Sequence, residues 1–288
     1  MSLTTHPTSP ASMTGARAPV NGKLSFGGIL RSEWIKLLSL RSMRWSILIM
    51  LLLSFGAAAM MTGAMSSYMP LTEATMPMLL VQSAAFGTVF TVLIMGVIGV
   101  LAMTSEYASG MILSSLTAVP SRTPLFIAKG LAVALLSLVV GAVSVFGGGV
   151  IAALMVGDGA FAALFSGPVL QSLIGAVLYL TLAALMSYGI GTLMRSSAAA
   201  IATVVGLLFV VTIAFQFLSM TSWEWVPVVS EWMPASLGQA LETAAVSVPG
   251  EFGGSTGVGY GPALIGLVIW AAAALIPASL LFKTRDAV

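Results

Sequence analysis

The sequence has no cysteine, and its single histidine, His6, lies close to the amino terminus. Disulfides and thiolate metal sites are therefore excluded, and a histidine-based catalytic or metal centre is not expected. Counting residues leaves a Ser-Lys dyad open, but Lys129 follows a polar segment and precedes an apolar run. We interpret it as a lysine that extends its amine toward lipid headgroups. We expect no catalytic residue, no metal site and no enzymatic activity in this chain.

Charge is also scarce: only 7% of the 288 residues are charged, whereas 58% are hydrophobic. The apolar residues form unbroken runs, which excludes an ordinary soluble domain. Six runs are long enough to cross a bilayer as helices, and the short alternating segments of a membrane barrel are missing. The six predicted spans are Trp45–Ala64, Leu79–Met103, Gly130–Val156, Val169–Met194, Ser197–Met220 and Pro262–Phe282. We therefore expect an all-α integral membrane protein, with six transmembrane helices forming a domain over 45–288.

None of these six spans contains Asp, Glu, Lys or Arg. Ion-driven carriers usually keep ionisable residues at membrane depth, so this pattern argues against such a carrier. The chain also has no GxxxxGK[ST] phosphate-binding loop. If the protein moves a compound against a gradient, the energy must come from another polypeptide.

The basic residues predict the orientation. With the amino terminus inside, all eleven Lys and Arg residues fall on the cytoplasmic side. The charged residues of the connecting segments on the other side are all acidic. We expect a multi-pass protein with both termini in the cytoplasm. An Ala-, Gly- and Val-rich, Lys-poor composition is typical of a GC-rich bacterial genome, which favours a bacterial cytoplasmic membrane.

Two elements are predicted before the first span. Residues 1–22 are rich in Ser, Thr, Pro and Gly and are expected to form a disordered cytoplasmic tail. Residues 23–44 are predicted to form an amphipathic interfacial helix containing Trp34. Lys36 lies on its polar side and Glu33 among its apolar positions, from where Glu33 can pair with Lys36. The apolar face comprises Phe26, Ile29, Leu30, Trp34, Leu37 and Leu40.

A short polar segment, 104–122, separates the second and third spans. Ser105 is predicted to cap a helix that begins at Glu106 and ends before Pro120. Tyr107, Met111, Leu113 and Leu116 would give this helix an apolar contact surface. The alternative is that Glu106 merely caps a helix end at the interface.

The stretches "EYASGMI" and "TAVPSRTPLFIAKG", together with "RSEWIKLLSLRS" before the first span, resemble type-2 permeases of ATP-binding-cassette (ABC) transporters. The resemblance implies that 104–122 contains a coupling helix that docks on a separate ABC ATPase. It implies coupling residues Glu106, Tyr107, Gly110, Met111, Ile112, Leu113 and Leu116. It also implies that ATP is hydrolysed by the partner, and that this chain binds no cofactor and no nucleic acid. Met111, Ile112 and Leu113 depart from the Thr or Arg of many relatives, so a polar contact to the ATPase is missing there or supplied elsewhere.

The segment 221–261, between the last two spans, is expected on the outer side. Leu237, Leu241 and Ala245 recur at helical spacing between Pro234 and Pro249 and predict a short helix. It would be an anchoring helix or, alternatively, an exit gate. Small residues in spans four and five predict an antiparallel pair packed within the molecule, with a seam between two permease chains as the alternative. These residues are Ala183, Ser187 and Gly191 in span four, and Ala198, Ala202 and Gly206 in span five.

Two functions from different classes follow. The first is the permease subunit of an ABC exporter, acting as a homodimer or heterodimer in the bilayer, with a hydrophobic or amphipathic substrate such as a drug, antibiotic, peptide or lipid. The second is a membrane scaffold or sensor that does not transport. The scaffold would tolerate Glu106→Ala, whereas the exporter would not.

Overall fold

The computed structural model describes residues 25–68, 71–119, 122–157, 159–221, 223–243, 245–246 and 257–284. Within these residues the chain is helical and contains no strand. The predicted tail at 1–22, Pro120 and Pro249 lie outside the described residues.

Six described helices are long and apolar enough to cross a membrane, as the sequence predicted. They are α2 (Arg41–Tyr68), α3 (Met76–Ala108), α5 (Arg122–Val156), α7 (Gly167–Met194), the continuous run Ser197–Thr221 and α12 (Tyr260–Thr284). The helices α2, α3 and α5 extend three or more residues beyond the predicted spans into polar sequence, whereas the other three extend at most two residues beyond them at either end. The class of fold, an all-α membrane protein with six spans, is confirmed.

The run Ser197–Thr221 consists of α8 (Ser197–Val205), a π-helical turn, η1 (Gly206–Val210), then α9 (Val211–Leu218) and a 3₁₀ turn, η2 (Ser219–Thr221). The remaining helices are short. They are α1 (Phe26–Ser39), α4 (Met111–Ala118), α6 (Ala160–Leu164), α10 (Trp225–Glu231) and α11 (Pro234–Thr243). The helix α11 matches the one predicted between Pro234 and Pro249, although Ala245 lies beyond its end.

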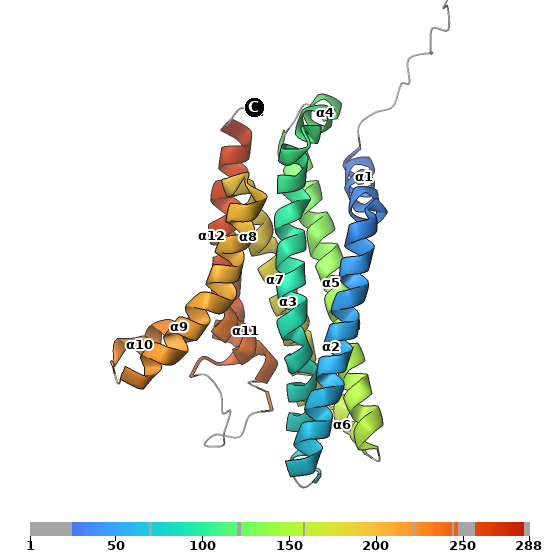
Figure 1. The fold of residues 1–288 in the computed structure, drawn as a ribbon, viewed down its shortest axis with the longest axis vertical. Helices are drawn as coiled ribbons and strands as arrows, with labels where there is room; N and C mark the ends of the chain where they lie inside the picture. The colour runs from blue at the N-terminus through green and yellow to red at the C-terminus, as the bar shows by residue number, and fades with distance from the viewer. Residues whose placement is uncertain are drawn as a thin grey trace, which may run out of the picture.

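The centre of the bundle is the contact between α3 and α7 (Figure 1). Small residues permit it: a Cβ added to Gly99 would lie 2.4 Å from the carbonyl oxygen of Ala184, and one added to Gly191 would lie 2.9 Å from that of Val100. Both distances are too short for any side chain, so these backbones can approach only through glycine. Ser187 is also buried against Gly96 and Gly99 of α3, so the small residues of span four pack internally, as predicted.

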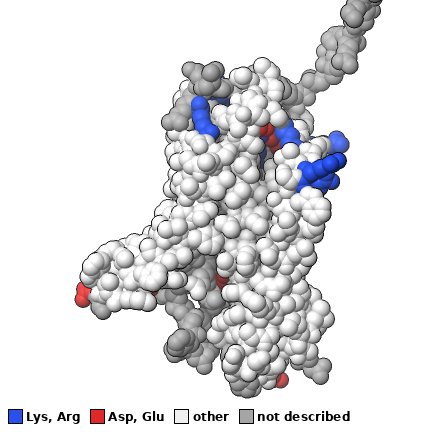
Figure 2. Space-filling view, viewed as in Figure 1, with Lys and Arg blue, Asp and Glu red and all other residues white. Residues whose placement is uncertain are grey.

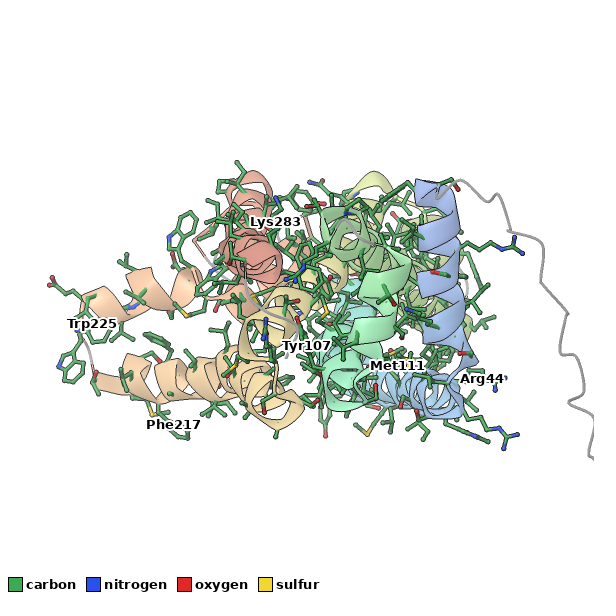
Figure 3. All side chains as sticks on the ribbon, turned by 90° about the horizontal axis from the view of Figure 1, so that it is seen from above. Arg44, Tyr107, Met111, Phe217, Trp225 and Lys283 are labelled. Carbon is green, nitrogen blue, oxygen red and sulfur yellow. The ribbon has the colours of Figure 1, made fainter. Side chains whose placement is uncertain are left out.

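The small residues of span five behave differently. Ala198 and Ala202 are exposed, and a Cβ on Gly206 would meet nothing within 4 Å. The prediction that this stripe packs within the molecule is therefore wrong. The run instead leans out of the bundle: α9 and α10 extend to one side together, and Phe217 and Trp225 lie far from the other helices (Figures 1 and 3).

The candidate coupling site

Lys and Arg gather at one end of the visible face of the molecule, whereas the opposite end shows acidic residues (Figure 2). The first end carries α1, α4 and the end of α12 (Figure 1). In a hollow at this end, acidic side chains are visible beside the basic ones (Figure 2). Two elements that the sequence singled out separately, the helix before the first span and the segment after the second, therefore meet in space.

Helix α1 contributes Glu33 and Lys36. Ser25 caps the helix, its hydroxyl oxygen accepting a hydrogen bond from the Gly28 amide. The buried stripe of α1 is Ile29, Glu33 and Leu37, which recur every four residues. Glu33 thus occupies the middle of the face that packs on the bundle and is only 3% exposed. Phe26 and Leu40, which were predicted to share this apolar face, are exposed.

Helices α3 and α5 contribute Glu106 and Lys129. Helix α3 continues through Ala108, so Glu106 lies in its last turn and does not begin a new helix. The prediction that Ser105 caps a helix is wrong, because its hydroxyl donates to the carbonyl oxygen of Leu101 within α3. Lys129 lies inside α5 and is 3% exposed, so the interpretation of its amine as reaching toward headgroups is also wrong.

These side chains form a closed set of contacts, which we call the charge cluster: Glu33, Lys36, Glu106 and Lys129. The Lys129 Nζ lies 2.5 Å from Oε2 of Glu33 and 2.5 Å from Oε1 of Glu106. The Lys36 Nζ lies 2.7 Å from Oε1 of Glu33 and 3.1 Å from Oε1 of Glu106. The Glu33–Lys36 pair was predicted from sequence and is confirmed. The second partner of each residue was not predicted.

The charge cluster has two negative and two positive groups, so it is neutral as a unit. Lys36 is its most exposed member. Burial lowers the pKa of Lys36, but the hydrogen bond to Glu33 and the attraction of Glu106 raise it more. The pKa of Lys36 therefore lies above its usual range. Such a cluster gives little net stability, because desolvation offsets the attraction. Removing one partner is costly, however, since it leaves a buried charge uncompensated.

The charge cluster also reaches α4 through Ser115. The Lys36 amine donates to the Ser115 hydroxyl oxygen at 3.3 Å, and that hydroxyl donates to Oε2 of Glu106 at 3.4 Å. Sequence reasoning missed Ser115. The spacing of Ile112, Ser115 and Val119 was the only available signal. Ile112 and Ser115 form the buried side of α4, and Val119, which directly follows the helix, is buried as well.

Helix α4 is the segment predicted to couple, and it begins later than expected. Gly110 separates it from α3 with φ of 71°, a left-handed conformation that glycine adopts most easily. Met111 and Leu113 are 46% and 53% exposed, whereas Ile112 is buried against the bundle. Figure 3 shows α4 and the labelled Met111 at the surface of this end. The apolar contact surface predicted for this segment is thus reduced to Met111 and Leu113 among the side chains described.

The other predicted residues lie around the charge cluster. Tyr107 is half-buried, and the guanidinium of Arg195 lies 5.0 Å from the centre of its ring, so Tyr107 contacts the turn between α7 and α8. Trp34 is half-buried on α1, beside the buried stripe. Leu116 lies in α4, but its side chain is outside the described set. Among the described residues, no group of three or more His, Asp or Glu could hold a metal ion.

The fold and this end of the molecule define a multi-pass helical membrane protein with a buried cluster of charged side chains that joins α1, α3 and α5. A family model described as ABC-2 family transporter protein matches residues 29–216, about two thirds of the chain. The chain therefore belongs to the ABC-2 family of transporter proteins, and it is a permease domain, the membrane component of an ABC transporter. No curated protein matches the sequence.

Proposed function

We propose that this chain is the permease subunit of an ABC exporter, driven by a separate ATPase that docks on α4 and α1. Two permease chains, identical or different, would assemble in the bacterial cytoplasmic membrane with both termini in the cytoplasm. The exported compound would be hydrophobic or amphipathic. ATP would be bound and hydrolysed by the ATPase subunit alone.

The charge cluster is the observation that carries this proposal. It joins the helix before the first span (α1), the end of the second span (α3), the start of the third (α5) and, through Ser115, the short helix between them (α4). Four elements held by charged hydrogen bonds cannot move independently without exposing a buried charge. A displacement of α4 or α1 by a bound partner would therefore move the two spans α3 and α5 together.

The surface beside the charge cluster is suited to a partner. Met111 and Leu113 project from α4, and a cleft of about 210 Å³ lies between α4 and α1, lined in part by Ser32, Ser114 and Ser115. Exposed apolar side chains beside polar groups are common in interfaces between subunits. This arrangement supports α4 and α1 as one docking surface.

A groove of about 710 Å³ next to the charge cluster supports an amphipathic substrate. It lies between α1 and α2 on one side and α3 on the other, and most of its walls are apolar. Glu106 and Lys36 lie at its polar end, whereas Ile49, Leu93 and Val97 line it deeper along the spans. A compound with a polar head and an apolar body would match both parts.

The proposal is tested by purifying the tagged chain from its native host in mild detergent and identifying the proteins that accompany it by mass spectrometry. We expect a stoichiometric ABC ATPase with the wild type. Leu113→Asp should remove most of it by placing a charge in the docking surface, and Glu106→Ala should do so by breaking the charge cluster.

Val228→Asp is the matched control, because Val228 is about as exposed as Leu113 but lies on α10, which projects to one side of the bundle away from α4 and α1 (Figure 1). It should leave the ATPase bound. If no ATPase accompanies the wild type under conditions that preserve a known ABC complex, the exporter is contradicted. The scaffold or sensor would then be the better explanation.

A further inference from the structure

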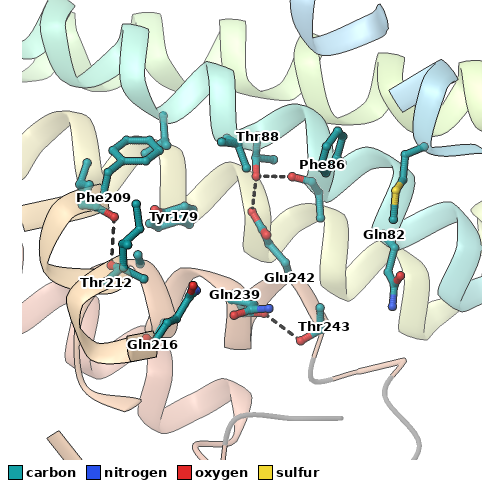
Figure 4. Close-up of a pocket in the computed structure, with 18 residues that line it drawn as sticks. Gln82, Phe86, Thr88, Tyr179, Phe209, Thr212, Gln216, Gln239, Glu242 and Thr243 are labelled. Atoms are coloured by element: carbon teal, nitrogen blue, oxygen red, sulfur yellow. Dashed lines mark hydrogen bonds between the residues drawn. The ribbon is translucent and has the colours of Figure 1, made fainter. Parts of the chain in front are cut away.

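A second cavity, of about 570 Å³, lies away from the charge cluster, between α3, α7, the η1–α9 part of span five and α11 (Figure 4). Its apolar rim includes Phe86, Val89 and Ile213, which are all exposed on the side of the bundle. Glutamine and threonine side chains line its interior, among them Gln216 and Gln239 (Figure 4). The cavity is thus open laterally and polar at its floor.

Glu242 of α11 lies at that floor and is only 6% exposed. None of the residues that line the cavity is basic. The sequence has no Lys, Arg or His between Arg44 and Arg122, or between Arg195 and Lys283, the segments that contribute most of the lining. A buried carboxylate must be neutralised or paired. The lining of this cavity offers Glu242 no cationic partner.

The contacts of Thr88 show how Glu242 is accommodated in the empty cavity. The Thr88 hydroxyl oxygen lies 2.7 Å from Oε1 of Glu242 and 2.7 Å from the carbonyl oxygen of Ala85 (Figure 4). A hydroxyl has one hydrogen, so the Thr88 hydroxyl shares that hydrogen between the two acceptors when the carboxyl group is ionised. A protonated carboxyl group removes this competition, because it can donate its own proton to the Thr88 oxygen.

We propose that this cavity binds a hydrophobic cation, an amphiphile with an ammonium or similar group, and that Glu242 is its counter-ion. On binding, the carboxyl proton leaves to water and the cation takes its place, so the floor of the cavity stays neutral. The Thr88 hydroxyl then turns its hydrogen to the carboxylate. The apolar rim receives the hydrophobic part of the ligand directly from the side of the bundle.

The titration of Glu242 fits this exchange. Burial raises its pKa to about 7, in spite of the opposing hydrogen bond from Thr88. Tyr179 of α7 is the only other titratable side chain among the described residues of the lining, and it lies near Glu242 (Figure 4). An ordinary tyrosine stays neutral up to a pH of about 10, so within the described lining Glu242 alone changes charge between pH 6 and 8.

This inference deepens the proposed function and rests on it, because the cation would be the exported compound or one class of it. The two are tested separately. Binding in the cavity needs no ATPase, whereas the coupling experiment needs no ligand. Failure of the cation to bind would leave the docking surface intact, and failure to find an ATPase would leave a cation-binding membrane protein.

The test uses tetraphenylphosphonium, a permanent hydrophobic cation, and the full chain in nanodiscs of phosphatidylcholine. Equilibrium dialysis measures binding at pH 6 and pH 8, with empty nanodiscs subtracted. We expect affinity to be about tenfold higher at pH 8, since the ionised fraction of a group with a pKa of about 7 rises from about 0.1 to about 0.9. Glu242→Gln should abolish this pH dependence and weaken binding at pH 8 at least tenfold.

Two controls distinguish recognition of the positive charge from nonspecific hydrophobic binding in the cavity. Tetraphenylborate has nearly the same shape and the opposite charge, and it should not show binding that increases with pH. Glu224→Gln removes an exposed carboxylate from the turn before α10 and should bind the cation as the wild type does. Equal binding of the cation to wild type and Glu242→Gln at both pH values would overturn the proposal, as would equal binding of the borate.

Thr88→Val keeps the proposal testable if Glu242→Gln does not fold. Valine matches the shape of threonine but cannot donate to the carboxylate, so the ionised form of Glu242 is less favoured. The pH at which cation binding reaches half its maximum should therefore move upward. An unchanged midpoint in a folded Thr88→Val protein would contradict the role of Glu242 as counter-ion.

Discussion

Glu106 and Glu242 are both buried carboxylates at helix ends, but their side chains have opposite kinds of surroundings. Glu106 contacts the amines of two lysines from different helices, whereas among the described residues Glu242 contacts one hydroxyl and no lysine or arginine. A carboxylate paired with lysines of its own chain stays ionised and holds the helices of those lysines together. A carboxylate without partners has to take a proton or an external cation. The difference distinguishes a set of fixed ion pairs at one end of the bundle from the cavity in which we propose that Glu242 exchanges its proton for a cation.

Lys129→Met removes a partner of Glu106, and we expect it to lower the free energy of unfolding more than any other variant considered. It leaves Glu33 and Glu106 with only the half-exposed Lys36, and removing a partner from a buried ion pair costs about 3–5 kcal/mol. Thermal unfolding in nanodiscs measures the loss. Lys283→Met, which removes an exposed lysine near the same end, should change stability little, and an equal loss in both variants would show that the charge cluster has no special role.

Glu242→Gln is expected to act in the opposite direction. The pKa of Glu242 is about 7 in the folded protein and 4.5 as the reference value for the unfolded chain. Between these two pH values the carboxyl group ionises more readily in the unfolded chain, so the free energy of unfolding of the wild type falls as pH rises from about 4.5 to about 7. Glutamine avoids that cost. The variant should equal the wild type at pH 4.5 and be more stable at pH 8, by up to about 3 kcal/mol.

The measurement is the unfolding midpoint of wild type and Glu242→Gln across this pH range. Glu224→Gln is again the matched control, and it should show no such divergence, because its carboxylate is exposed. If Glu242→Gln lost stability at pH 8, Glu242 would be a paired carboxylate like Glu106, and the comparison would fail.

Gly110→Ala sharpens the link between the charge cluster and α4. Nothing lies within 4 Å of the added methyl group, so the cost is that of a left-handed backbone at alanine, about 1–2 kcal/mol. We expect that loss in thermal unfolding, together with weaker ATPase co-purification, because alanine favours continuing α3 into α4. Gly56→Ala has equally open space but an ordinary helical backbone, and it should be neutral or slightly stabilising.

Lys36→Met should have the smallest effect within the charge cluster. Lys36 contacts both carboxylates as Lys129 does, but its side chain is 36% exposed, so solvent screens the charges that its loss leaves behind. The expected loss is about 1 kcal/mol or less in the same unfolding assay. A loss as large as that of Lys129→Met would mean that both lysines are equally needed, and that burial does not set their importance.

The six spans and the helix before them could be read from the sequence, because the length of an apolar run is a local property and a bilayer accepts only helices or closed barrels of suitable length. The Glu33–Lys36 pair was predictable for the same reason, since residues three apart on a helix are neighbours. The sequence also carried the family resemblance, which the match over residues 29–216 confirmed.

The tertiary structure alone decided which charges meet. Glu33 and Lys129 are 96 positions apart, and Thr88 and Glu242 are 154 apart, so no local pattern could pair them. Hydropathy assigns each charged residue to the end of a helix or to a loop, but only the packing of α1, α3 and α5 shows that Glu106 and Lys129 are buried together. It is likewise the packing of α11 on α3 that turns Glu242, a residue of an apparently exposed segment, into the floor of a cavity.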